Sequence, residues 1–163
     1  MLGKIEKVTT GEGISYAKKT LFYCDPTMFN TEYNALPHLA HPGIVKPVHA
    51  NRKHLYMEYV EGSKLQNTPL TIEESIFIFI QTTEALSYVH NSGYSHGDIH
   101  DGNILVSPNK STAKLIDFGQ GFRVGQDEHY LVRFDITQFS EMLKEWIKQT
   151  EFPSNYETKK DVL

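Results

Sequence analysis

Two short polar segments constrain this chain more than any other feature of its sequence. The first, His-Gly-Asp-Ile-His-Asp-Gly-Asn at 96–103, places Asp98 five residues before Asn103. The second, at 115–119, places Asp117 after an apolar pair and before Phe-Gly. Phosphoryl transfer needs one carboxylate to orient the attacking hydroxyl, and further side-chain oxygens to hold magnesium ions on the nucleotide phosphates. Together the two segments therefore indicate a phosphotransfer site built from two loops.

The bulk composition is that of a globular protein. The 163 residues, 39% of them hydrophobic, suffice for one domain or for two small lobes that share a cleft. A net charge of −4 argues against a nucleic-acid partner, because phosphate binding needs a basic surface. Cys24 is the only cysteine, which excludes an internal disulfide framework and fits a reducing compartment.

The hydropathy pattern bears on the membrane and the compartment. The longest apolar run is too short to span a bilayer, and the first residues have no signal-peptide pattern. We therefore expect no membrane partner. We expect a cytoplasmic protein, or one in the host cytosol if it is an effector or viral protein.

Periodicity and breakers predict strands first and helices later. A capping box, Thr71-Ile72-Glu73-Glu74, marks the start of the most regular helix. In chain order, the expected elements are a hairpin at 8–21 turning at 10–13, a short helix at 25–36, strands at 44–48 and 54–60, a helix at 72–90, strands at 104–106 and 113–116, a helix at 134–148, and a polar, poorly ordered tail at 150–163.

Both long helices are expected to be amphipathic, with their apolar stripes in the core. The first stripe comprises Ile72, Ile76, Phe79, Ile80, Thr83, Leu86 and Val89 or His90, and the second comprises Ile136, Phe139, Met142, Leu143, Trp146 and Ile147. An alternative interpretation of the second helix is that its aromatic face forms a partner surface.

The two polar segments resemble the catalytic loop and the Asp-Phe-Gly motif of protein kinases, in the family's order. The resemblance implies a bilobal α+β fold with a trimmed N-lobe sheet plus one short helix, and a reduced, mainly helical C-lobe. We expect one minimal domain over 1–163, with an N-lobe and hinge at 1–60, a reduced C-lobe at 61–149 and the tail at 150–163. The string H-G-D-I-H-x-G-N also resembles aminoglycoside phosphotransferases, and its first three residues resemble RIO-type kinases and the small kinase of the tRNA-threonylcarbamoylation complex.

The resemblance extends upstream to a lysine strand and a hinge. Tyr16-Ala17-Lys18-Lys19 is similar to the family's V-A-x-K strand, which implies that Lys19 contacts the nucleotide phosphates. Glu32 keeps the family's spacing for the glutamate that pairs with this lysine. Met57 would stand beside the adenine as gatekeeper, and the backbone of Glu58 and Val60 would bond the adenine edge.

The resemblance assigns the chemical roles to the two loops. Asp98 would be the catalytic aspartate, while Asn103 and Asp117 would bind magnesium. His96 would serve in packing and backbone hydrogen bonding rather than in acid–base chemistry. Asp135, expected to open the last helix, resembles the buried aspartate that braces the catalytic loop by accepting backbone N–H groups.

Several positions depart from the family pattern. Glu6 stands where the glycine-rich loop usually has a glycine, which would put a carboxylate near the phosphates. Gly97 replaces the arginine of most regulated kinases, so a phosphorylated activation loop would lack its anchor. His100 replaces the lysine of protein serine/threonine kinases. No A-P-E motif follows Asp117, and only a short segment separates Gly119 from the last helix.

These observations predict an ATP- and Mg²⁺-dependent enzyme that phosphorylates a serine or threonine hydroxyl on a protein. Lys19, Asp98 and Asn103 are the expected catalytic residues, and an activating or scaffolding protein is a further expected partner. Two alternatives stay open: a small-molecule phosphotransferase similar to those acting on aminoglycosides, and a nucleotide-binding pseudokinase or ATPase-like module that acts through a protein partner.

Overall fold

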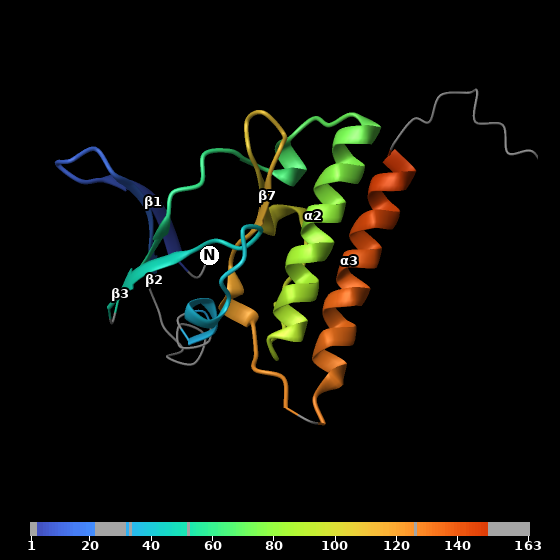
Figure 1. Cartoon of the computed structure of the whole chain (residues 1–163). Helices are drawn as coiled ribbons and strands as arrows, with labels where there is room; N and C mark the ends of the chain where they lie inside the picture. The colour runs from blue at the N-terminus through green and yellow to red at the C-terminus, as the bar shows by residue number, and fades with distance from the viewer. Residues whose placement is uncertain (1–2, 22–31, 33, 52, 126, 150–163) are drawn as a thin grey trace, which may run out of the picture.

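The computed structural model describes residues 3–21, 32, 34–51, 53–125 and 127–149, and its fold is α+β, as expected (Figure 1). An antiparallel sheet with the strand order β1-β2-β4-β3 forms one side of the molecule. Two long helices, α2 (Ile72–Asn91) and α3 (His129–Gln149), run side by side on the other. The sheet consists of β1 (Gly3–Thr9), β2 (Ser15–Leu21), β3 (Pro47–Ala50) and β4 (His54–Glu58).

The loop-rich middle of the chain lies between the sheet and the helices. It carries a small sheet of β5 (Ser63–Lys64), β6 (Ile104–Val106) and β7 (Ala113–Leu115), in that order. Short 3-10 turns are η1 (Leu36–His38), η2 (Leu65–Asn67), η3 (Asp101–Asn103) and η4 (Phe118–Gln120). Both polar segments identified in the sequence fall within this region.

The hairpin expected at 8–21 is present, but its first strand begins at Gly3 and pairs with β2 along its whole length. Continuous pairing fixes which side chains share a face, because directly opposed residues of an antiparallel pair point the same way. Ile5 lies opposite Lys19, and Glu6 lies opposite Lys18. Lys19 therefore lies on the other face of the sheet from Glu6.

The strand predicted at 44–48 lies further along the chain, as β3 at Pro47–Ala50. Ile44 forms an isolated parallel bridge with Leu115, and Val45 donates its N–H to the Leu115 carbonyl at 3.0 Å. These bonds tie 43–45 to β7, so the regular strand starts only at Pro47. Pro47 lies on the edge strand β3, where a missing N–H is tolerated. The strand expected at 54–60 ends at Glu58.

Helix α2 matches its expected bounds, and its capping box is formed by Thr71 and Glu74. The predicted inward stripe is confirmed at Phe79, Leu86 and Val89. It is wrong at Ile76 and Ile80, which are 51% and 52% exposed. The buried positions are Ser75, Ile78, Phe79, Thr82, Ala85, Leu86 and Val89. Small residues allow close approach on this face: a Cβ on Gly43 would lie 2.8 Å from that of Ala85.

Helix α3 begins at His129, five residues before the expected start, so Asp135 lies in its second turn instead of opening it. Phe139, Met142, Leu143 and Trp146 pack against the core, whereas Ile136 and Ile147 are half exposed. The core itself is centred on Phe118, Leu36, Ile44, Leu55, Ile78, Ile104 and Leu115. Within the described part of the chain, no helix is long and apolar enough to cross a membrane.

Two expectations fall outside the described residues. Most of the helix expected at 25–36 does so, although Glu32, Asn34 and Ala35 are helical and lead into η1. The tail at 150–163 lies outside them entirely.

Candidate active site

Three charged side chains from distant parts of the sequence meet between the sheet and the loops. Lys19 Nζ on β2 lies 2.7 Å from Glu32 Oε2 and 2.7 Å from Asp117 Oδ1. The side chains of Lys19 and Glu32 are 12% and 3% exposed, and that of Asp117 is 41% exposed. The expected Lys19–Glu32 ion pair is therefore present, and the same ammonium joins the N-terminal sheet to the second loop.

The three groups perturb one another's protonation. Burial alone would lower the pKa of Lys19, but the neighbouring carboxylates outweigh it and the pKa is raised. Burial raises the pKa of Glu32 despite its bond to Lys19. Burial also acts to raise the pKa of Asp117, but the Lys19 ammonium prevails and lowers it. Lys19 is thus held as a cation beside Asp117 as an anion.

The Oε1 atom of Glu32 is buried and has no hydrogen-bond partner among the described residues. An unsatisfied buried acceptor is unusual in folded proteins and is found at functional sites.

The first loop brings Asp98 and Asn103 into contact. Asn103 donates from Nδ2 to the Asp98 carbonyl at 2.9 Å and to Asp98 Oδ2 at 3.1 Å. The amide oxygen of Asn103 has no hydrogen-bond partner among the described residues, and the side chain of Asp98 is 36% exposed. The loop therefore presents one carboxylate and one amide oxygen together, as the spacing of five residues predicted.

Asp135 holds this loop from helix α3. Its fully buried carboxylate accepts the N–H of His96 at 2.8 Å and the N–H of Gly97 at 2.7 Å. The bracing contact expected from the sequence is present. The structure adds a third donor that the sequence analysis missed, since His90 Nε2 on α2 lies 2.8 Å from Asp135 Oδ2. No signal in the sequence links residues 45 apart.

His96 is fully buried and bonded on both ring nitrogens. Nδ1 accepts the Asp98 N–H at 3.3 Å, which requires the proton on Nε2, and Nε2 then donates to the Ile116 carbonyl at 3.0 Å. Its ring packs against Phe118, with the ring centres 4.5 Å apart. Burial lowers the pKa of His96, so the ring stays neutral and serves as a spacer between the two loops.

Asp117 adopts a left-handed backbone conformation, with φ 63° and ψ 69°. Aspartate tolerates this region better than most residues, but the conformation carries strain and commonly occurs at functional sites. The turn buries Phe118 completely in the core while its neighbour Asp117 points at Lys19.

The hinge candidates lie at the end of β4. Met57 is 6% exposed and pairs with Ala17 across the sheet, on the face that carries Lys19. The Val60 N–H has no hydrogen-bond partner among the described residues. Met57 and the Val60 N–H are thus placed where an aromatic ring with a polar edge could lie.

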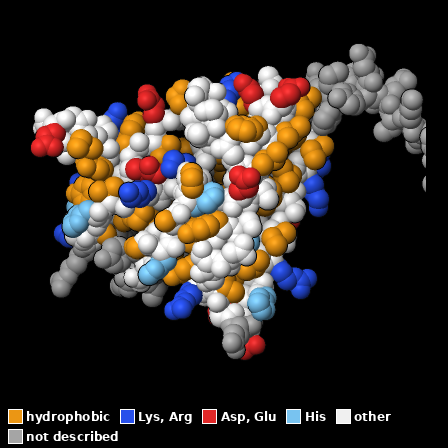
Figure 2. Space-filling view, viewed as in Figure 1, with side chains coloured by type: hydrophobic (Ala, Val, Ile, Leu, Met, Phe, Trp, Pro, Cys, Tyr) orange, Lys and Arg blue, Asp and Glu red, His pale blue; other side chains and the backbone are white. Residues whose placement is uncertain are grey.

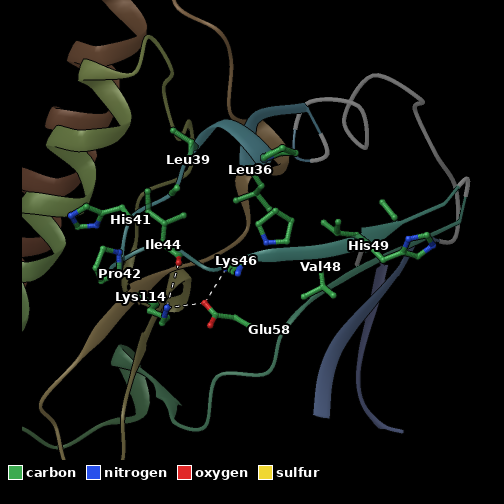
Figure 3. A pocket seen from close by; sticks show the side chains of 15 residues that line it. Leu36, Leu39, His41, Pro42, Ile44, Lys46, Val48, His49, Glu58 and Lys114 are labelled. Carbon is green, nitrogen blue, oxygen red and sulfur yellow. Dashed lines mark hydrogen bonds and ion pairs between the residues drawn. The ribbon is translucent and has the colours of Figure 1, made fainter. Parts of the chain in front are cut away.

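The side chain of Glu58 serves a different purpose, which the sequence analysis missed. Figure 3 shows it turned into a cavity of about 800 Å³ toward β7. There Glu58 Oε1 accepts from the Lys46 N–H at 2.9 Å and from Lys114 Nζ at 2.7 Å. The Glu58–Lys114 pair ties the end of the large sheet to the small one. Because the Glu58 N–H donates to the Lys46 carbonyl at 2.9 Å, only the Glu58 carbonyl is left for the hinge role.

The pairing register of β1 and β2 decides on which face of the sheet the Glu6 carboxylate lies. Its carboxylate lies across from Lys18 and pairs with Lys4, on the face away from Lys19. The expectation of a carboxylate near the phosphates is therefore wrong, because alternation along β1 turns Glu6 outward. On the Lys19 face of β1, Lys7 Nζ lies 4.2 Å from the ring centre of Tyr59 and holds β1 over the hinge.

The two unusual loop residues have structural causes. Gly97 has φ +80°, and a Cβ there would lie 2.2 Å from the Gln120 carbonyl oxygen, so arginine does not fit without movement. His100 accepts the Gly102 N–H on Nδ1 at 3.0 Å, and its Nε2 lies 3.7 Å from Asp98 Oδ2. A histidine N–H therefore faces Asp98 where the expected family has a lysine.

The donor set fits magnesium nucleotide better than a metal held by protein alone. Among the described residues, no three His, Cys, Asp or Glu side chains gather as a metal site. Asn103 and Asp117 offer oxygen ligands, which Mg²⁺ prefers, and Mg²⁺ completes its shell with waters and phosphates. The Lys19 cation at this position is consistent with a polyanionic ligand.

Comparison with known proteins gives a consistent result. A family model of the protein kinase domain matches residues 3–161. The chain is 31% identical over 123 residues to the maternal embryonic leucine zipper kinase of Xenopus tropicalis, covering 69% of this chain and 19% of that protein. It is 30% identical over 133 residues to sperm motility kinase 2B of Mus musculus, covering 76% and 27%. It is 34% identical over 100 residues to the probable serine/threonine-protein kinase PknB of Lactococcus lactis, covering 56% and 16%. The chain thus spans about a quarter or less of these relatives.

Proposed function

The chain belongs to the protein kinase family, and we propose that it transfers the γ-phosphoryl group of ATP, with Mg²⁺, to a serine or threonine hydroxyl of a protein in the cytoplasm. The observation that carries this proposal is the convergence of Lys19, Glu32 and Asp117 beside the Asp98–Asn103 pair. The serine/threonine assignment is supported by the names of relatives such as PknB.

Each residue has a defined task in this proposal. Asp98 accepts a hydrogen bond from the acceptor hydroxyl and orients its oxygen toward the phosphorus. Lys19 neutralises phosphate charge, and Glu32 keeps the Lys19 ammonium in place. Bound Mg²⁺ would bridge the phosphates and neutralise developing charge, with Asn103 and Asp117 as its protein ligands.

A phosphotransfer assay on purified protein tests the proposal. Wild type, Asp98→Asn and the exposed-site control Asp127→Asn receive γ-labelled ATP and Mg²⁺, with mixed casein and histone as acceptors. We expect label on serine or threonine with wild type and control, and about 10²- to 10⁴-fold less with Asp98→Asn. Equal labelling by Asp98→Asn would contradict the proposal.

A parallel assay separates the two alternatives. Label transferred to a panel of amino sugars, but to no protein, would favour a small-molecule phosphotransferase. His100 beside Asp98 is the observation that favours this reading.

The partner-module alternative is favoured by exposed apolar residues on the helices. Figure 2 shows hydrophobic side chains gathered over α2 and α3. Ile76, Phe77 and Ile80 on α2 and Ile136 and Ile147 on α3 are each about half exposed. Under this reading the protein binds nucleotide, transfers no phosphate, and acts through an activating or scaffolding partner on this surface. Nucleotide-dependent thermal stabilisation without any phosphotransfer would support it.

A further inference from the structure

The two edges of the large sheet differ in how well they are protected against the addition of another strand. Strand β3, at one edge, has four residues, begins with Pro47 and shows a register shift between Pro47 and His49. Proline and irregular pairing are common devices by which proteins block an exposed edge. Strand β1, at the other edge, has seven residues, no proline and an unbroken register with β2. The β1 edge therefore lacks the protection that the β3 edge has.

The backbone of β1 is paired on one side only. Strand β2 is its single neighbour in the described part of the chain, and no backbone hydrogen bond from outside β2 reaches residues 4–8 there. A strand paired on one side presents a row of unpaired N–H and C=O groups on the other. Ile5, in the middle of this row, is 57% exposed. A β-branched apolar side chain at the centre of an unpaired edge favours the addition of an extended strand.

The charges along β1 indicate which strand fits this edge. Lys4 and Glu6 flank Ile5, share one face of the strand and form an exposed ion pair with each other. We consider a second copy of β1 that pairs antiparallel with the first, with Ile5 at the two-fold axis. Lys4 of each copy then lies opposite Glu6 of the other, and the two Ile5 side chains lie opposite each other. This register gives two opposite-charge pairs and one apolar pair, both of which stabilise sheets.

The other symmetric registers of the same strand are less favourable. A two-fold axis at Lys4, Glu6 or Lys7 places two like charges directly opposite each other, which destabilises a sheet. An axis at Val8 pairs only Lys7–Thr9 of each copy, because β1 ends at Thr9. The sequence of the strand thus favours the register centred on Ile5.

We propose that β1 is a self-association edge, at which two copies of this chain pair antiparallel through Gly3–Lys7 with Ile5 at the two-fold axis. The two large sheets then form one continuous sheet. The interface does not depend on the phosphotransfer proposed above, but it lies next to that site, because Ile5 is directly opposite Lys19 on β2. The added strand therefore extends the face of the sheet that carries the Lys19 ammonium.

Charge reversal tests both the edge and its register. Sedimentation equilibrium over about 1–200 µM protein measures the dimer dissociation constants of wild type, Lys4→Glu and Glu6→Lys. In each variant alone, both symmetric pairs become like-charged. In an equimolar mixture of the two variants, a heterodimer again joins opposite charges at both pairs. Lys53→Glu and Glu84→Lys, alone and mixed, are the matched controls, since they make the same charge changes at exposed positions outside β1.

We expect wild type and both controls to dimerise with similar affinity. Each β1 variant alone should dimerise about tenfold more weakly or worse, and their mixture should recover the wild-type affinity within about threefold. Recovery in the mixture also shows that both variants are folded. A wild type that stays monomeric over the whole concentration range would overturn the proposal, and so would a mixture as weak as its components or an equal loss in the controls.

A further variant separates this edge from the exposed apolar residues of the helices. Helices α2 and α3 lie on the opposite side of the molecule from β1 (Figure 1). Ile80→Glu places a charge on the exposed surface of α2 and leaves β1 unchanged. We expect Ile80→Glu to dimerise as wild type does. Loss of the dimer in Ile80→Glu, with its retention in Lys4→Glu, would assign the interface to the helices and overturn the proposal.

Discussion

The ammonium of Lys19 and the carboxylate of Glu32 lie 2.7 Å apart, and both side chains are almost fully enclosed. An ion pair in such a place contributes little net stability, but the loss of one partner leaves a buried charge without compensation. The pair is therefore better understood as a device that fixes the position of Lys19 than as a source of stability.

The first prediction follows from this asymmetry. Lys19→Met should reduce the free energy of unfolding by about 3 kcal/mol at neutral pH, because Glu32 and Asp117 then face each other unpaired. Lys19→Met/Glu32→Gln should recover a large part of that loss, since the buried carboxylate is gone. Urea unfolding of wild type, Lys19→Met, Glu32→Gln and the double variant measures both effects. A double variant no more stable than Lys19→Met would show that the buried charge of Glu32 is not the cause.

The second prediction concerns the brace on the catalytic loop. Asp135→Ala leaves the N–H groups of His96 and Gly97 buried without an acceptor, which should cost about 2–4 kcal/mol of stability. Phosphotransfer should fall further than nucleotide affinity, because the loop that carries Asp98 loses its anchor. Chemical denaturation and a nucleotide titration measure the two effects. Asp127→Asn, at an exposed position, is the control, and equal stability of the two variants would contradict the bracing role.

Much of this arrangement could be predicted from the sequence because kinase motifs are local and ordered. The segments around Asp98 and Asp117 are read directly, and the Lys19–Glu32 contact follows from spacing within the family. The capping box likewise fixes the start of α2 at Ile72.

The sequence predictions fail at positions where tertiary contacts determine which side chains are buried or paired. The inward face of α2 was misassigned because Ser75 and Thr82 are buried with their hydroxyls bonded to the helix's own carbonyls, whereas Ile76 and Ile80 are exposed. Apolar periodicity cannot detect small polar residues that satisfy themselves in this way. The Glu58–Lys114 pair joins residues 56 apart, for which no local pattern exists.

The third prediction concerns His96 and pH. Because burial lowers the pKa of this ring, the unfolded chain binds a proton more readily than the native protein below about pH 6.5. Stability should therefore fall as pH drops through 6.5 toward the lowered native pKa, by at most about 1.4 kcal/mol per pH unit from this residue. Imidazole ¹⁵N NMR should show the Nε2–H tautomer unchanged between about pH 8 and 6. Titration of His96 with a midpoint at or above its ordinary value would exclude this explanation.

The fourth prediction compares two glycines with the same backbone conformation. Gly93 and Gly97 have φ +79° and +80°, but a Cβ on Gly93 meets nothing within 4 Å, whereas one on Gly97 would lie 2.2 Å from the Gln120 carbonyl oxygen. Gly93→Ala should cost only the strain of a left-handed alanine, about 1–2 kcal/mol. Gly97→Ala should cost about 1–3 kcal/mol more, because it adds a steric clash, and it should reduce phosphotransfer by displacing Asp98. Gly97→Arg, which introduces the residue typical of regulated kinases, should be at least as harmful as Gly97→Ala. Thermal unfolding of the three variants measures the difference. Equal costs at both positions would mean that contact with Gln120 does not explain the glycine at position 97.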